Sequence, residues 1–297
     1  MIVPAQTLPS PAAVLELLKP VTWFPPMWAF ACGVVSSGVP ASGHWTAIVA
    51  GVILAGPMVC AASQAVNDWF DRHVDAINEP GRPIPSGRIP GQWGLAIACL
   101  WTLLSLALAA ALGPSVLAAG VFGLALAWAY SAPPLRLKLD GWWGNAACGL
   151  CYEGLAWITG AAVMLGGALP GAGIFALAGL YSLGAHGIMT LNDFKSIEGD
   201  RVMGVRSLPV QLGVQRSAQV ACLAMAAPQA AVILLLLAWG RPLHAAVVAA
   251  LLLGQFELMR RFLRDPRAHA TWYSGNGIIL FVLGMLASAF ALQGAAA

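Results

Sequence analysis

Two clusters of carboxylate and amide residues lie where long apolar stretches of the chain end. The first cluster contains Asn67, Asp68, Asp71 and Asp75. If one helix runs through it, these side chains recur at spacings of three and four residues and lie one above another. The second cluster contains Asn192, Asp193, Glu198 and Asp200. These are the residues in the chain whose types and spacing best suit chemistry.

Carboxylates at these positions need a compensating charge. The macrodipole favours cations at the carboxyl end of a helix, and like charges one turn apart repel each other. Carboxylate and amide oxygens suit Mg²⁺, which typically takes one or two carboxylates plus substrate phosphates. We therefore expect Mg²⁺ as the cofactor, with all eight residues as candidate ligands. A solvated polar helix end is the competing interpretation.

Basic residues near the clusters carry the opposite charge. Acids that hold Mg²⁺ beside Lys and Arg, at the mouth of an apolar bundle, are typical of a site for a diphosphate with an apolar tail. The residues expected to bind the diphosphate are Lys19, Arg72, Tyr130, Arg136, Lys138, Lys195 and Arg201. Those expected to be catalytic are Asp71, Arg72, Lys138 and Asp200. The tendency of basic residues to lie on the cytoplasmic side competes with function for each one singly.

The composition indicates the kind of protein that positions these residues. The 297 residues are 59% hydrophobic and only 9% charged, with a mean hydropathy of +0.78. Soluble domains carry about a quarter charged residues, so the chain is expected to be a polytopic membrane protein. The net charge of +3 is too small to indicate a nucleic-acid partner.

Five long stretches are nearly free of charge, and they set the expected number of helices. They are residues 21–66, 89–135, 141–192, 217–256 and 268–297, interrupted only by Glu153 and Arg241. A transmembrane helix needs about 20 residues, so the first four stretches each fit two helices and the last fits one. Turn signals at residues 36–43, 113–114, 166–173 and 240–242 agree with this division. The sequence predicts one all-α membrane domain of about nine transmembrane helices over residues 1–297, with a loose tail at 1–15.

The basic residues then gather on one side of the membrane, and Arg241 alone lies opposite. Because cytoplasmic loops carry an excess of Lys and Arg, the charged face is expected to be cytoplasmic. The amino terminus would then lie in the cytoplasm and the carboxyl terminus on the other side.

The motif Asn67-Asp68-x-x-Asp71-x-x-x-Asp75 resembles the first aspartate-rich motif of the UbiA-type prenyltransferases, and the second cluster is similar to their second motif. Longer strings resemble the chlorophyll and bacteriochlorophyll synthases of that family, namely residues 19–24, 71–80, 82–87 and 192–200. The resemblance covers essentially the whole chain. One departure is Ser196, where the wider family often has Asp, so Asp193 or Glu198 would replace that ligand.

The resemblance implies a UbiA-type helical bundle that transfers a geranylgeranyl or phytyl group from its diphosphate to the propionate of bacteriochlorophyllide. His73 and residues 88–91 are closer to the bacteriochlorophyll branch. The acceptor carboxylate is ionised at neutral pH, so no general base is needed. The resemblance also implies a bacterial inner (intracytoplasmic) membrane, a site on its cytoplasmic side, and pigment-biosynthesis or assembly proteins as candidate partners.

Two polar residues lie within the expected spans. Glu153 is mid-span, and an ionisable group at that depth is a functional hypothesis. It would line the acceptor pocket or be a protonated packing residue. His186 precedes Asp193 by seven residues and would lie deeper on the same face. It would approach the tetrapyrrole magnesium or be a buried structural histidine.

Three alternatives remain open. Chlorophyllide is one alternative acceptor, and a quinone ring or haem is another within the same fold. From a different class, a divalent-cation transporter would use the acidic clusters as ligands. Transporter sites usually lie near the membrane midplane, whereas these clusters lie at span ends.

Overall fold

The computed structural model describes residues 8–293, which form helices joined by loops and contain no strand. The α-helices are α1 (Pro11–Leu17), α2 (Phe24–Ser36), α3 (Trp45–Ile53), α4 (Ala61–Asn78), α5 (Trp93–Leu112), α6 (Pro114–Ser131), α7 (Gly141–Gly149), α8 (Ala156–Met164), α9 (Ala172–Asp193), α10 (Ile197–Met203), α11 (Leu208–Leu212), α12 (Val214–Ala238), α13 (Pro242–Arg264) and α14 (Pro266–Leu292). Two short 3₁₀ segments are η1 (Pro20–Thr22) and η3 (Leu137–Leu139). Two π-helical segments are η2 (Leu54–Cys60) and η4 (Leu150–Leu155).

Eight helical segments of the described chain are long and apolar enough to cross a membrane. Two of them are composite, because η2 joins α3 to α4 and η4 joins α7 to α8. A further apolar helix, α2, has only 13 residues. The all-α membrane fold is therefore confirmed, whereas the count of nine full spans stays a prediction, as does the side of the amino terminus.

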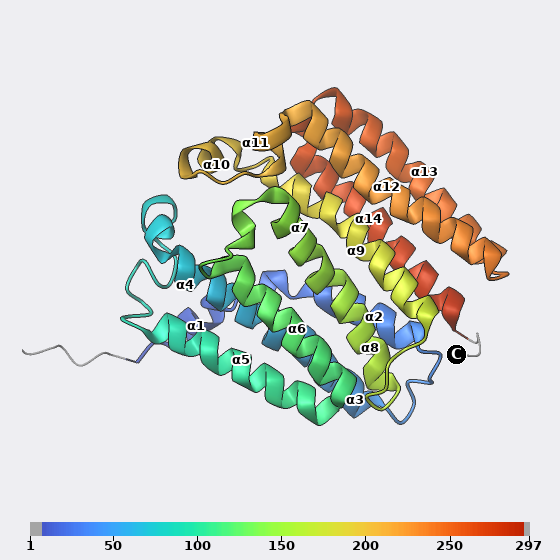
Figure 1. Cartoon of the computed structure of the whole chain (residues 1–297), viewed down its shortest axis with the longest axis horizontal. Coiled ribbons are helices and arrows are strands. Elements are labelled where there is room, and N and C mark those ends of the chain that lie inside the picture. The colour runs from blue at the N-terminus through green and yellow to red at the C-terminus, as the bar shows by residue number, and fades with distance from the viewer. Residues whose placement is uncertain (1–7, 294–297) are drawn as a thin grey trace, which may run out of the picture.

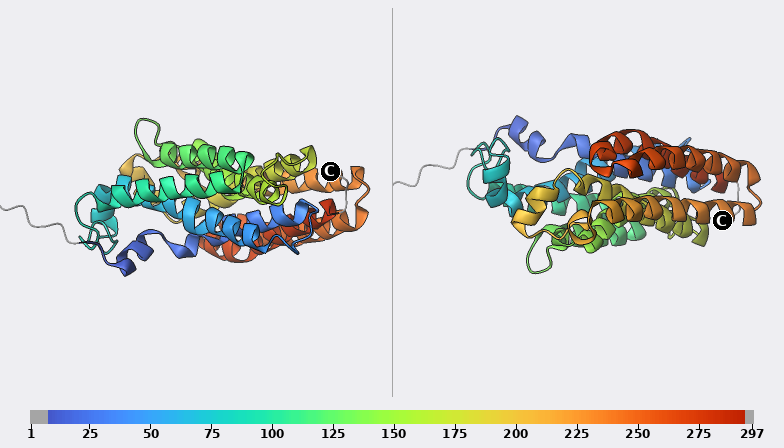
Figure 2. Two further views of the ribbon diagram at one scale, coloured as in Figure 1. Left: turned by 90° about the horizontal axis from the view of Figure 1, so that it is seen from below. Right: turned by 90° about the horizontal axis from the view of Figure 1, so that it is seen from above.

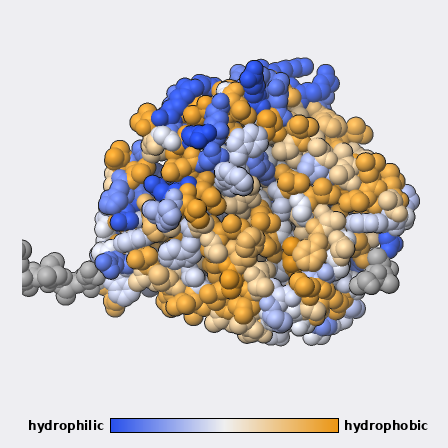
Figure 3. Space-filling model, viewed as in Figure 1, coloured by the Kyte–Doolittle hydropathy of each residue, from blue (hydrophilic) through white to orange (hydrophobic). Residues whose placement is uncertain are grey.

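The long helices form antiparallel hairpins with two distinct ends (Figure 1). The loop after α4 lies at one end with α10 and α11, and the opposite end holds the α8–α9 connection and the last described residues (Figures 1 and 2). Hydrophilic residues gather along the first of these ends, while hydrophobic residues cover the middle of the bundle (Figure 3). The expected turns at residues 113–114 and 240–242 connect α5 to α6 and α12 to α13.

Close contact between α2 and α8 holds the short helix in the bundle. A Cβ atom on Gly33 would lie 2.0 Å from the Trp157 carbonyl oxygen, and one on Gly160 would lie 2.1 Å from the Phe30 carbonyl oxygen. Only glycine allows the two backbones to approach this closely. In a membrane, such contacts replace the hydrophobic driving force that associates helices in water.

The two π-helical segments interrupt spans that line the same internal space. Pro57 lies inside η2, where it has no N–H to donate and its ring disturbs the preceding turn. Glu153 lies inside η4. Single-turn π-helical segments often mark functional sites, and both segments contribute to the cavity described below.

The expectation of a loose tail over residues 1–15 is wrong for residues 11–15, which form most of α1. Ser10 caps the helix by accepting a hydrogen bond from the backbone N–H of Ala13 (3.3 Å), and the following proline suits the first helical position. Leu17 is fully buried, and Glu16 pairs with Arg88 at 2.5 Å. These anchors order the segment, and residues 1–7 lie outside the described range.

Candidate active site

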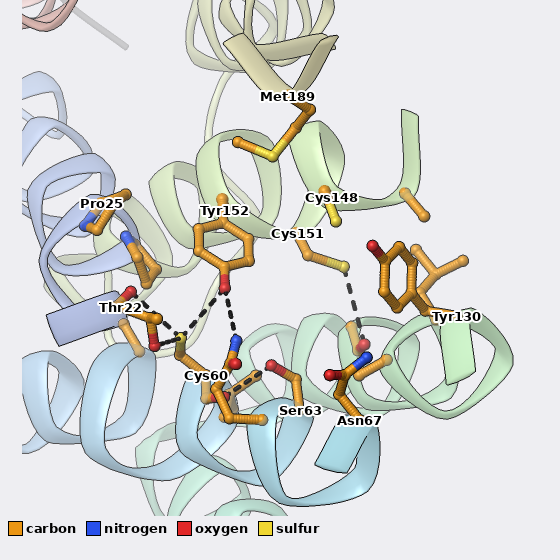
Figure 4. A pocket seen from close by; sticks show the side chains of 18 of the residues that line it. Thr22, Pro25, Cys60, Ser63, Asn67, Tyr130, Cys148, Cys151, Tyr152 and Met189 are labelled. Carbon is orange, nitrogen blue, oxygen red and sulfur yellow. Dashed lines mark hydrogen bonds between the residues drawn. The ribbon is translucent and has the colours of Figure 1, made fainter. Parts of the chain in front are cut away.

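A cavity of about 380 Å³ opens inside the bundle between α4, α6, α7 and α9, with η2 and η4 in its wall (Figure 4). Most of the surface area of its wall is apolar, as is usual for small-molecule sites. The polar side chains and thiols that line it are Thr22, Cys60, Ser63, Gln64, Asn67, Tyr130, Cys148, Cys151, Tyr152 and Asn192. Asn67 and Asn192 come from the two acidic motifs, so both motifs reach this cavity.

The first motif lies on the last turns of α4, which continues as helix to Asn78 as the spacing predicted. Asp71 accepts a hydrogen bond from Lys138 Nζ at 2.5 Å and lies 3.7 Å from Arg136. Asp68, which is buried, accepts one from Lys19 Nζ at 2.6 Å. The structure thus brings three predicted basic residues onto the first motif.

Arg82 is the fourth cation of this cluster. Its guanidinium lies 2.9 Å from Asp75, 3.5 Å from Asp68 and 2.7 Å from Glu79. A turn directly after α4, in which the Arg82 N–H donates to the Glu79 carbonyl at 3.0 Å, brings Arg82 back to the end of the helix. Arg82 was not among the site residues predicted from the sequence, although it is the first residue of the family-like string at residues 82–87.

Lys138 is held by the loop between α6 and α7. It lies in η3, and Asp140 directly after it caps α7 by accepting hydrogen bonds from the backbone N–H groups of Trp142 and Trp143. The Lys138 side chain is 12% exposed. Burial lowers the pKa of its ammonium below that of a free lysine, while the neighbouring Asp71 carboxylate opposes the shift.

Two carboxylates of the second motif, Asp193 and Asp200, are partnered by neutral side chains. Asn145 on α7 donates to Asp193 Oδ2 at 3.2 Å. Ser196 donates to Asp200 Oδ2 at 3.0 Å, and Asp200 is buried. Glu198 is exposed on the other side of α10 and pairs with the exposed Arg201 and Arg267, each at 3.3 Å. Lys195 is also exposed.

The comparisons with known proteins decide what kind of protein carries this site. The model of the UbiA prenyltransferase family matches residues 22–283 of the chain. The chain belongs to the UbiA prenyltransferase family. This confirms the family prediction and makes the chain a prenyltransferase rather than a cation transporter.

Named relatives within the UbiA family are similar over nearly the whole chain. The chain is 57% identical to the bacteriochlorophyll synthase 33 kDa chain of Cereibacter sphaeroides, covering 97% of this chain and 95% of that protein. It is 39% identical to the chloroplastic chlorophyll synthase of Oryza sativa, covering 93% of this chain and 76% of that protein. The fold matches a UbiA homolog from Archaeoglobus fulgidus bound to GPP and Mg²⁺, with a TM-score of 0.71 and 22% identity over 95% of this chain and 99% of that chain.

Oxygen ligands for the divalent cation expected in a UbiA-type site are present, but not as a ready-made cluster. In residues 8–293, no group of three or more His, Cys, Asp or Glu side chains is arranged to share a metal ion. Asp68 Oδ2 is buried without a hydrogen-bond partner in that range, and Asn67 and Asn192 add amide oxygens at the cavity wall. Because Mg²⁺ takes few carboxylates and several phosphate oxygens, the residues fit a site that a bound diphosphate completes.

Besides the exposed Lys195, Glu198 and Arg201, three further predicted residues contact other parts of the structure instead of this UbiA-type cavity. Arg72 donates to the Trp69 carbonyl at 2.7 Å and lies over the Trp69 ring. Glu153 is buried in η4 but is not among the lining residues, because it follows Tyr152 by one position and so points to a different side. His186 faces α7, with its ring 5.6 Å from that of Trp142. The acceptor-pocket roles of Glu153 and His186 stay predictions.

The polar residues in the deeper wall of the cavity were not predicted from the sequence. This deeper polar wall consists of Thr22, Cys60, Gln64 and Tyr152, all of which line the cavity. A signal for part of it existed, since Gln64 and Cys60 precede Asn67 by three and seven residues and therefore continue its helical face inward. Tyr152 comes from a distant helix, and no spacing in the sequence relates it to Gln64.

Proposed function

We propose that this UbiA prenyltransferase esterifies the propionate of bacteriochlorophyllide with a geranylgeranyl or phytyl group taken from its diphosphate. The observation that carries the proposal is the near full-length similarity to bacteriochlorophyll synthases, at 57% identity against 39% for the chlorophyll synthase of rice. The site agrees with that chemistry, because an apolar cavity ends at a cluster of cations and carboxylates.

The diphosphate of the donor binds at the ends of α4 and α9. Lys138 and Arg136, which now pair with Asp71, neutralise its oxygens, while Asn67 and Asn192 face it from the two motifs. A divalent cation, Mg²⁺ in this proposal, would be held by the Asp and Asn oxygens of both motifs and would stabilise the charge on the departing diphosphate. Positioned cations at a developing charge are commonly the largest single contribution to such catalysis.

The acceptor needs no proton removed from it. Its carboxylate is already ionised near neutral pH, so the chain has to orient the carboxylate and keep water from the reacting carbon. The largely apolar wall from η2, α6 and η4 serves the second purpose.

The chain is a multi-pass membrane protein, and in this proposal its active site faces the cytoplasm from the inner (intracytoplasmic) membrane. The support is the excess of Lys and Arg in the loops at the motif end of the bundle. A reporter inserted at residue 85 should register as cytoplasmic, and one fused at the carboxyl terminus as external. The reverse pattern would contradict this orientation.

Acceptor competition tests the proposed reaction. The purified protein with Mg²⁺ and geranylgeranyl diphosphate should be offered bacteriochlorophyllide and chlorophyllide together, and then phytyl diphosphate in place of the first donor. We expect a higher kcat/KM for bacteriochlorophyllide, within the roughly 10- to 200-fold that an apolar pocket can discriminate. A preference for chlorophyllide would overturn the choice of acceptor, and no ester from either pigment would overturn the reaction.

A further inference from the structure

Three side chains of the deeper polar wall, those of Gln64, Cys60 and Tyr152, meet one another, and Figure 4 labels two of them, Cys60 and Tyr152. Gln64 Nε2 on α4 donates to the Tyr152 hydroxyl oxygen on η4 at 3.1 Å, and Cys60 Sγ donates to the same oxygen at 3.5 Å. Neither the cations nor the carboxylates of the acidic motifs contact this group within the described chain. It is a separate polar feature of the same cavity.

The Tyr152 hydroxyl oxygen accepts a hydrogen bond from Gln64, and it shares the single S–H proton of Cys60 with the Thr22 carbonyl oxygen. Within residues 8–293, the Tyr152 O–H has no oxygen or nitrogen acceptor of its own. A phenol carries one O–H donor, and a glutamine amide carries two N–H donors. The Tyr152 proton and the second amide proton of Gln64 are therefore available to a ligand in the cavity. Both side chains are half-buried and line the cavity, so an acceptor atom of a bound molecule can reach these donors.

The position of the group relative to the diphosphate end suits a nucleophile. Gln64 and Asn67 are three residues, nearly one helical turn, apart on the same face of α4, about 4.5 Å along the helix. An attacking atom stands about 3–3.5 Å from the reacting carbon, and that carbon is still bonded to the leaving diphosphate oxygen. Figure 4 shows Cys60 and Tyr152 on one side of the cavity and Asn67 and Tyr130 on the other, with Ser63 between.

The chemistry of the donors also suits a reacting carboxylate. A lysine or arginine would hold the carboxylate tightly and withdraw charge from the oxygen that must attack. Neutral donors orient the anion while leaving more of its charge available. The cations of the cavity lie instead at the motif end, where a leaving diphosphate needs them.

We propose that Tyr152 and Gln64 bind the carboxylate of the acceptor by donating hydrogen bonds to it, one helical turn deeper than the diphosphate. This inference rests on the proposed function. The bound oxygen forms a C–O bond to the allylic carbon, the bond from that carbon to the diphosphate breaks, and the diphosphate leaves with the electron pair. No proton is transferred.

The test compares Tyr152→Phe and Gln64→Leu with the matched control Tyr181→Phe. Tyr181 is fully buried, its hydroxyl forms a hydrogen bond with that of Ser288 at 2.8 Å in the core, and it does not line the cavity. Two tetrapyrroles are used with each variant, bacteriochlorophyllide and its neutral propionamide, which cannot be esterified and acts as a competitive inhibitor. Affinity for an unreactive geranylgeranyl thiolodiphosphate reports whether the donor site is intact.

We expect each cavity variant to raise the KM for bacteriochlorophyllide about 10- to 100-fold, the range for a lost hydrogen bond to a charged group. The inhibition constant of the amide should change much less, and affinity for the thiolodiphosphate should stay as in the wild type. Tyr181→Phe should move none of the three.

Two results would overturn the inference. Unchanged discrimination between acid and amide would mean that the pair does not contact the carboxylate. A parallel loss of thiolodiphosphate affinity would assign the residues to donor binding or to folding. Failure of the proposed function is a different result, because the wild-type protein would then form no ester from any tetrapyrrole acid.

Discussion

The two acidic motifs are similar in sequence, yet the structure surrounds them with different partners. The carboxylates of the first motif, at the end of α4, are each paired with Lys or Arg. In the second motif, Asp193 and Asp200 are held by the neutral side chains of Asn145 and Ser196. The protein itself supplies cations to every carboxylate of the first motif, whereas in the second motif only the exposed Glu198 pairs with arginines.

This difference suggests a division of labour. In the proposed reaction, the cations of the first motif would turn to the diphosphate and leave Asp71 free to bind a metal ion. The second motif has oriented oxygens but no protein cation beside Asp193 or Asp200 in the described chain. It is therefore the place where an added divalent cation relieves charge most directly.

The largest effect is expected from removing one carboxylate of each motif. Asp71→Asn and Asp200→Asn should each lower kcat by about a thousandfold, at the upper end of what loss of one charge-stabilising group costs. Turnover at saturating Mg²⁺ measures this. Glu198→Gln is the matched control, because Glu198 is exposed and pairs with surface arginines. If Glu198→Gln is as inactive as Asp200→Asn, the assignment of ligands in the second motif is wrong.

Lys138 tests the cationic side of the first motif. Lys138→Ala should lower kcat/KM for the prenyl diphosphate about 100-fold, the loss of a charge-assisted contact, and should leave the KM for the pigment unchanged. The pH profile gives a second readout. Because burial lowers the pKa of Lys138, its charge is lost as pH rises through a value below that of a free lysine, about 10.4.

In the wild-type protein, kcat/KM for the prenyl diphosphate should therefore decline as the pH rises. The midpoint of this decline should lie below the pKa of a free lysine, about 10.4. In Lys138→Arg the guanidinium remains charged, so the alkaline decline should shift upward. An alkaline limb that is identical in the two proteins would exclude Lys138 as the titrating group.

Arg82 tests whether the first motif depends on protein cations for stability. Arg82→Gln leaves Asp75 without its cation, and the free energy of unfolding should fall by about 2 kcal/mol. Breaking a fully buried pair costs about 3–5 kcal/mol. The loss should be smaller here because Lys19 still compensates the neighbouring Asp68. Thermal unfolding in detergent measures it. Arg88→Gln is the control, since the exposed pair of Arg88 with Glu16 should matter little. Equal destabilisation by both would contradict a special role for Arg82.

Much of this site could be predicted from the sequence, because its signals are local. Charge-free stretches have the length of membrane helices, and the spacing of Asn67, Asp71 and Asp75 holds as long as α4 continues. Lys138 was found because it lies in a short loop between two spans. In each case the decisive distance is along the chain.

Contacts that depend on how a loop turns back, or on which helices pack together, could not be predicted in this way. Arg82 reaches Asp75 only because the loop after α4 folds back. Tyr152 on η4 meets Gln64 on α4, although 88 residues separate them in the sequence. The helical face shared by His186 and Asp193 was inferred correctly, but the side chain turns toward Trp142 instead of the cavity.

The smallest expected effect concerns Ser196, and it sharpens the contrast between the motifs. Ser196→Ala removes the hydroxyl that donates a hydrogen bond to Asp200. Loss of a side chain that orients a metal ligand typically lowers metal affinity or activity 10- to 100-fold. For this partly exposed contact, we expect the Mg²⁺ concentration at half-maximal rate to rise about tenfold. Ser196→Asp should act in the opposite direction, because a second carboxylate beside Asp200 attracts the cation. In EDTA the same variant should unfold at a lower temperature, since two like charges then face each other one turn apart. If neither substitution changes the Mg²⁺ dependence, the second motif does not hold the metal, and the contrast with the first would be one of packing alone.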